Sequence, residues 1–162
     1  MAIFVKNGFN IGPDATVMIQ YEQTGLVIPA QALGHLMEIS AEQMTEPIKL
    51  EPITDGGRPV IENIFVGWSG EMTFARVNGL LTGLFSAVEQ NFFNGIRTHF
   101  NIQVEVNNLD GTVDSYLFEA GVLTRPGFGR FRMREAVEQR IGFEMRTMIV
   151  TAGPGSLIPL AA

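Results

Sequence analysis

Apolar and polar residues alternate with a period of two along much of this 162-residue chain. Successive side chains of an extended strand point to opposite faces, so this alternation predicts strands that each have one covered face. In one such run Met37, Ile39 and Ala41 share the covered face. Six runs are predicted as strands: residues 15–22, 35–43, 68–76, 98–107, 113–123 and 137–149.

The last of these runs is also the longest. Its apolar residues, including Ile141 and Phe143, lie on one face, which we expect to be core. An extended strand of this length would reach roughly 40 Å, more than most single domains need. We therefore expect it to bend or to cross a boundary between subunits. Its opposite face carries Glu138, Arg140, Glu144 and Arg146.

Local signals add a hairpin and a helix. Asp110-Gly111 between two predicted strands is a strong hairpin signal, because glycine supplies the positive φ of a tight turn. Asn78 can cap a helix that ends at Asn94-Gly95. Apolar residues recur through it at helical spacing and predict a covered stripe that lies over a sheet or a barrel end: Leu81, Leu84, Phe85, Val88 and Phe92.

Two further segments are predicted as docking segments. Residues 44–63 are predicted as a loop that is longer than a simple connection between strands needs, and their interspersed apolar residues suit contact with another surface. One form of this prediction is a hairpin with residues 55–57 at its tip. Residues 151–162 form a C-terminal arm. Strands, one helix and then more strands, without βαβ alternation, predict a mainly β fold: an antiparallel barrel or sandwich with one flanking helix, as a single domain over 1–162.

Composition changes the picture of the surface. Only 17% of residues are charged and 46% are hydrophobic, which is apolar for a soluble monomer and suits a subunit whose faces are covered by its copies. The formal charge of −6 gives no counterion-release affinity for nucleic acid. No apolar run is long enough to span a membrane, and no signal peptide is recognisable at the N-terminus, so we expect a cytoplasmic protein without membrane insertion.

Residues that carry chemistry are sparse, so we expect no enzyme, no cofactor and no metal site. Cysteine is absent. His35 and His99 are isolated and are better explained as packing residues. The segment 67–70 lacks the spacing of a nucleophile elbow and is predicted as the glycine-flanked start of a strand.

One basic cluster leaves two interpretations open. Its arginines, with phenylalanines between them, could contact bases and phosphates. We favour interface arginines that pair with acidic residues of a neighbouring subunit, because the rest of the chain is acidic. The cluster consists of Arg125, Arg130, Arg132 and Arg134.

Four segments, taken in order, resemble the tail tube proteins of contractile-tailed bacteriophages. They are Phe4-Val5-Lys6-Asn7-Gly8-Phe9-Asn10-Ile11-Gly12, Val66-Gly67-Trp68-Ser69-Gly70-Glu71-Met72, Asn107-Asn108-Leu109-Asp110-Gly111-Thr112-Val113 and Val137-Glu138-Gln139-Arg140-Ile141-Gly142-Phe143. The resemblance implies a virion protein whose hexameric rings stack into a tube. It also implies that a contractile sheath surrounds the tube, that baseplate and tail terminator proteins bind its ends, and that DNA passes through the lumen during ejection without specific binding.

The resemblance also suggests roles for particular residues. The face with Glu138, Arg140, Glu144 and Arg146 becomes a candidate lumen or subunit-contact surface. A candidate inter-ring or inter-subunit loop contains Ile48, Leu50, Ile53, Asp55 and Arg58. The same fold occurs in the haemolysin-coregulated protein of type VI secretion, so a secretion tube is the nearest alternative, and a small β-barrel ligand-binding module is the other.

Overall fold

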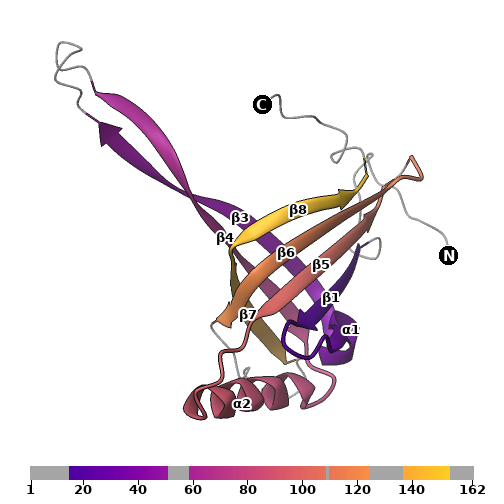
Figure 1. Cartoon of the computed structure of the whole chain (residues 1–162). Helices are drawn as coiled ribbons and strands as arrows, with labels where there is room; N and C mark the ends of the chain where they lie inside the picture. The colour runs from indigo at the N-terminus through magenta and orange to yellow at the C-terminus, as the bar shows by residue number, and fades with distance from the viewer. Residues whose placement is uncertain (1–14, 51–58, 109, 125–136, 154–162) are drawn as a thin grey trace.

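The computed structural model describes residues 15–50, 59–108, 110–124 and 137–153 (Figure 1). All strand pairings among them are antiparallel, and the described strands follow the order β2-β1-β5-β6-β7-β4-β3, with β8 also on β6. The elements are β1 (Ala15–Tyr21), β2 (Val27–Pro29), α1 (Ala30–Leu33), β3 (His35–Leu50), β4 (Val60–Ala75), α2 (Leu80–Phe93), β5 (Phe100–Asn107), β6 (Val113–Thr124), β7 (Glu138–Met145) and β8 (Thr147–Ala152).

These strands form two layers that share β6, which we call the first sheet (β2-β1-β5-β6-β8) and the second sheet (β3-β4-β7 with the end of β6). Within the described residues the sheet does not close on itself, since β2 and β3 stand at its two ends. The short helix α1 packs between these ends against β1, β2 and β3, and its Ala30 and Leu33 are buried. The predicted mainly β, antiparallel fold is confirmed in its sandwich-like form.

The last predicted strand does bend. It divides at Arg146 into β7, which pairs with β4 and the end of β6, and β8, which pairs with the beginning of β6. Up to Met145 the odd-numbered residues are buried, whereas beyond the bend Met148 is the residue that packs against the core. The bend therefore shifts the inward-facing positions by one residue as the chain passes from one sheet to the other.

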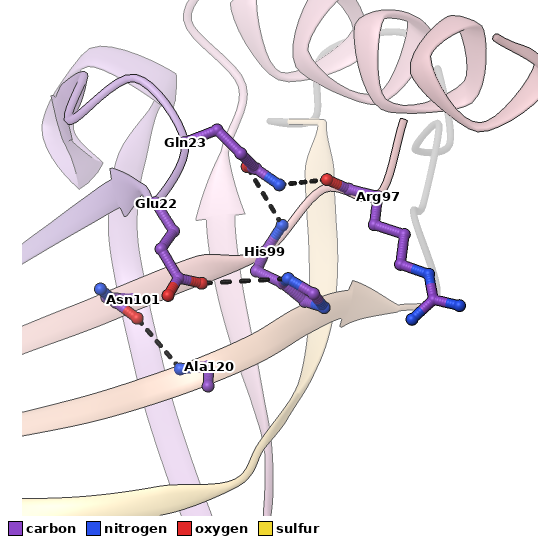
Figure 2. Close-up of polar contacts among 6 residues, drawn as sticks. All are labelled: Glu22, Gln23, Arg97, His99, Asn101 and Ala120. Atoms are coloured by element: carbon purple, nitrogen blue, oxygen red, sulfur yellow. Dashed lines mark hydrogen bonds and ion pairs between the residues drawn. The ribbon is translucent and has the colours of Figure 1, made fainter. Parts of the chain in front are cut away.

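The strand β6 changes sheet at a β-bulge (Figure 2). Ala120 has a φ of 54°, and its backbone N–H donates to Asn101 Oδ1 at 3.0 Å. A Cβ at the next residue, Gly121, would overlap Met145 and the Glu144 carbonyl. Bulges bend a strand and increase its twist, so this one directs the end of β6 towards β7.

The core lies between the two layers and is aromatic at its centre. Phe143 is fully buried, its ring lies 6.0 Å from that of Phe118, and Phe118 meets Trp68 edge-on at 5.8 Å. A Cβ at Gly70 would overlap the Phe143 ring and the Ser40 carbonyl, so only glycine admits the ring there. Ile141 is also fully buried, and the predicted core face of the last strand is confirmed as far as Met145.

The helix α2 lies across one end of the sandwich (Figure 1). The N-cap residue is Gly79, and the preceding Asn78 accepts the Leu80 N–H with its Oδ1 at 3.0 Å. Gly95, with a φ of 74°, follows the last turn, so both predicted ends are confirmed to within one residue. Leu81 is buried, and Leu84, Phe85 and Val88 pack against the core. The prediction was wrong for Phe92, which is 75% exposed.

Other predictions need correction. A β-bulge in β3 exposes Met37 and places Leu36 against the core instead. Residues 67–70 lie inside β4, which begins at Val60, and are not the start of a strand. The short elements β2 and α1 had no sequence signal that predicted them. The predicted hairpin at Asp110-Gly111 is confirmed by the pairing of β5 with β6.

Candidate assembly surfaces

A two-stranded arm extends from the sandwich and replaces much of the predicted loop at residues 44–63 (Figure 1). We define the β3–β4 arm as residues 44–50 and 60–66, which pair with each other up to Leu50 opposite Val60. Pairing between β7 and β4 begins only at Trp68, so no third described strand supports the arm. The prediction of a loop was therefore wrong for residues 44–50 and 60–66, whereas the alternative prediction of a hairpin fits them. The predicted tip at residues 55–57 lies outside the described ranges.

The arm exposes an unusual number of large apolar side chains. Isolated two-stranded hairpins are marginally stable in water, and soluble monomers rarely expose large contiguous apolar patches. The arm therefore has the composition of a surface that is covered by a partner. Its exposed apolar residues are Ile48, Leu50, Val60, Ile61, Ile64, Phe65 and Val66.

The strand β3 also presents a long free edge. It is 16 residues long and, in the part of the chain described, pairs with β4 alone. The backbone groups on its other side are thus available for pairing with another strand, which is the usual hazard of an edge strand in a monomer. Pro47 lies in β3, and proline is tolerated in an edge strand because one side of it needs no hydrogen bonds.

The outer face of the second sheet is polar and mostly acidic. Residues directly opposite one another in antiparallel strands point to the same face, which places Arg140 beside Thr73 and Glu144 beside Ser69. Arg140 lies 3.7 Å from Glu71 and 4.0 Å from Glu138, and these are exposed pairs worth little to stability. The charged members of this polar face are Glu38, Glu42, Glu71, Glu138, Arg140, Glu144 and the adjoining Arg146.

A groove opens where the last turn of α2 approaches the end of β6. This α2 groove has a volume of about 450 Å³, and Phe92, Ile96 and Val122 are exposed apolar residues in its lining. Arg97 and His99 also line it. Among the described residues the Arg97 guanidinium makes no ion pair. The groove therefore combines an apolar floor with a basic side.

The wall of this groove is held by the turn between β1 and β2 (Figure 2). The Gln23 side chain donates to the Arg97 carbonyl and accepts the His99 N–H at 3.5 Å. The Glu22 N–H donates to the His99 carbonyl at 3.0 Å, and Glu22 Oε2 lies 3.9 Å from His99 Nδ1. These contacts join the segment between α2 and β5 to the β1–β2 turn.

The predicted site residues have different outcomes. Glu138, Arg140, Glu144 and Arg146 are all exposed on the polar side of β7 and at its bend. Ile48 and Leu50 lie exposed on the arm. The other predicted residues lie outside the described ranges. They are Ile53, Asp55 and Arg58 of the loop, the arginines Arg125, Arg130, Arg132 and Arg134, the opening segment 4–12 and most of the C-terminal arm at 151–162. Their predicted roles remain predictions.

Chemistry at other positions is limited to what the described residues contain. No cluster of three or more His, Cys, Asp or Glu side chains suited to a metal ion is found among them. None of the helices in the described ranges has the length and apolarity needed to cross a membrane. The α2 groove was missed from sequence, because its apolar residues belong to three elements that only the fold brings together. The sequence places Phe92 in the covered stripe of the helix, so it offers no signal for this groove.

Comparison with known proteins identifies the fold. No family model matches the sequence, and no curated protein matches it. A chain of the sheath–tube complex of the extracellular contractile injection system PVC is 14% identical, with a TM-score of 0.59 over 85% of this chain and 88% of that one. The tube-terminating cap of the anti-feeding prophage is 13% identical, with a TM-score of 0.59 over 94% of this chain and 97% of that one.

The SPP1 tail tube is 17% identical, with a TM-score of 0.54 over 91% of this chain and 81% of that one. All three identities are low, so the likeness concerns the fold. The agreement extends over most of each chain. The chain therefore has a tail-tube-like fold.

Proposed function

We propose that this chain is the structural subunit of a tube, built from hexameric rings that stack to form the tail tube of a contractile-tailed phage. The observation that carries the proposal is the β3–β4 arm with the free edge of β3. This unit exposes apolar side chains that a monomer leaves in water, beside strand-edge backbone groups that no described strand pairs with. The tail-tube-like fold supports the same conclusion.

Ring formation follows from the free edge. An edge strand pairs readily with a strand of another chain, and in a ring each subunit offers its β3 to the next. Such pairing extends the second sheet from subunit to subunit and closes it into a larger barrel. The apolar arm then contacts neighbours and contributes most of the hydrophobic stabilisation of the assembly.

The polar face of the second sheet lines the lumen in this arrangement. With Arg146 included, that face carries five carboxylates and two guanidinium groups, a formal charge of −3. A surface of the same sign as DNA repels the phosphate backbone and lets it slide without binding. The candidate residues Glu138, Arg140, Glu144 and Arg146 are thereby assigned to the lumen in preference to a subunit contact.

The proposed partners are a contractile sheath outside the tube, a baseplate at one end and a terminator at the other. The compared structures include a sheath–tube complex, an anti-feeding prophage baseplate and a tube-terminating cap, which supports partners of these kinds. The chain acts in the virion tail as a non-catalytic protein and is assembled in the host cytoplasm. No cofactor takes part.

Electron microscopy of the purified protein tests the proposal directly. We expect negative-stain images and light scattering at physiological salt to show rings or tubes. A protein that stays strictly monomeric at high concentration would refute the proposal. In that case the α2 groove would direct attention to the alternative of a small ligand-binding module, since concave apolar pockets of this size are typical ligand sites.

A second candidate is the tube of a contractile injection system. Two of the compared structures belong to such particles, which favours this candidate as much as the SPP1 tail tube favours a phage. The neighbouring genes distinguish the two. Sheath, baseplate and capsid genes beside the gene for this chain would support a phage tail. Sheath and baseplate genes without capsid genes would support an injection system.

Charge reversal in the lumen gives a prediction for the polar face. Replacing Glu138 and Glu144 by Lys changes its formal charge from −3 to +1, and we expect the assembled tubes to retain DNA. The measurement is the fraction of double-stranded DNA that cosediments with tubes at low and at high salt. The same substitutions at Glu89 and Glu119, outside this face, serve as the control. Equal DNA retention by both variants would place the lumen elsewhere.

A further inference from the structure

Two apolar surfaces that no other described residue covers lie at opposite ends of the molecule. The arm extends away from the sandwich at one end, and α2 with its groove lies at the other (Figure 1). The arm is convex, being a two-stranded hairpin with exposed apolar side chains such as Ile61 and Phe65. The α2 groove is concave, and Phe92 and Val122 contribute apolar surface to it. The molecule thus carries one projecting and one concave apolar surface.

The charges of the two surfaces are complementary. Arg97 lines the groove, and its guanidinium makes no ion pair among the described residues. The described part of the arm carries Glu46 and Glu62 against one lysine. Over residues 44–63 the sequence has four acidic and two basic side chains, a formal charge of −2. An acidic arm therefore meets a basic groove, which favours one orientation of contact.

The two surfaces also fit the geometry of a filament. A contact between two different patches of the same protein is heterologous, and when it is repeated without closure it generates an open helical assembly. Because the arm and the groove lie at opposite ends, each subunit can give its arm to one neighbour and receive the arm of another. Gln23 joins the groove wall to the β1–β2 turn, which limits the ordering that binding requires on the receiving side.

We propose that the α2 groove of one subunit is the receptor for the β3–β4 arm of a second copy, and that this contact links successive rings. The inference rests on the proposed tube function and adds to it the receiving surface. Apolar arm side chains fill the groove between Phe92, Ile96 and Val122, while Arg97 pairs with a carboxylate of the arm. The contact thus determines the axial order of the stack.

A matched pair of substitutions tests the receptor. Phe92 and Phe93 are adjacent and almost equally exposed, at 75% and 76%, but Phe92 lines the groove and Phe93 does not. We expect Phe92→Ser to raise the protein concentration needed for tube formation at least about tenfold, because a central aromatic anchor carries much of the energy of a contact. Phe93→Ser should leave it unchanged. Circular dichroism of both variants checks that the subunit remains folded.

Crosslinking tests the identity of the occupant. The chain has no cysteine, so introduced pairs react without a background. We expect Ile61→Cys with Val122→Cys to give a ladder of covalent multimers from assembled tubes in the presence of a short bismaleimide. The control is Ile61→Cys with Val113→Cys, where Val113 is exposed at the opposite end of β6, and it should give no ladder.

The outcomes separate the inference from the function on which it rests. Loss of tubes with Phe92→Ser alone, together with the groove-specific ladder, supports the receptor. Tubes that form normally from Phe92→Ser, equal losses in both variants, or equal ladders from both cysteine pairs overturn the receptor and leave the tube function standing. Failure of the unaltered protein to form rings or tubes overturns the proposed function, and the inference with it.

Discussion

Truncation of Phe143 to Ala gives the most direct test of the core. The side chain is fully buried, its ring lies 6.0 Å from that of Phe118, and Gly70 leaves the space that the ring fills. The truncation removes these contacts and leaves a cavity between the two layers. Losses of about 3–5 kcal/mol are typical for a buried Phe→Ala change. For a chain of this size, that corresponds to a fall in Tm of roughly 6–20 °C.

The assay is urea and thermal unfolding followed by circular dichroism, at a protein concentration low enough for the unassembled subunit. This condition matters because assembly stabilises the folded state by mass action and would mask the loss. The control is Phe93→Ala, at a residue that is 76% exposed, and it should change the free energy of unfolding by less than about 0.5 kcal/mol. A loss below about 1 kcal/mol for Phe143→Ala, or equal losses for both variants, would refute the assignment of this core.

Three further predictions concern the arm, the bulge and a turn. Replacing residues 51–59 by Asn-Gly should leave the subunit folded, because loop closure depends weakly on length, but should abolish ring stacking in electron micrographs; normal tubes would exclude that role. Asn101→Ala should lower stability by about 1 kcal/mol in urea unfolding, since it removes the acceptor at the β6 bulge, whereas Asn101→Asp should retain most of it. Hydrogen bonds from Thr112 hold the pKa of Asp110 below its ordinary value of 3.8. The ionised Asp110 therefore contributes to the free energy of unfolding fully above pH 3.8, and this contribution is lost as pH falls through the pKa of the folded state. NMR titration of Thr112→Val should show the Asp110 pKa moving up towards 3.8, and an unchanged pKa would contradict this cause.

Much of the fold could be predicted from sequence because most strands have one buried and one exposed face. The alternation on β1 and β7 predicts core residues such as Ile19 and Ile141 correctly. The Asp110-Gly111 turn and the ends of α2 are local signals, and they too are confirmed. Each of these features depends on residues that are close together in the sequence.

The features that could not be predicted depend on distant residues. Nothing near Met37 in the sequence indicates the bulge that exposes it, because the bulge depends on the pairing of β3 with β4. Residues 44–63 are predicted as a loop because their prolines and mixed polarity do not fit a strand with one covered face. The large apolar residues of the arm are exposed on both strands, so they show no division into a covered and a polar face. The α2 groove likewise exists only after α2, β5 and β6 come together.

The sharing of strands between the two layers has a mechanical consequence. β6 runs through both sheets, and β7 continues into β8 across the bend at Arg146, so two continuous backbones connect the layers. In a sandwich joined only by loops, a pulling force can separate the layers by breaking side-chain contacts. Here the same force would also have to break strand pairings along β6 and β8. We therefore expect the subunit to bear tension as one unit, with both layers yielding together.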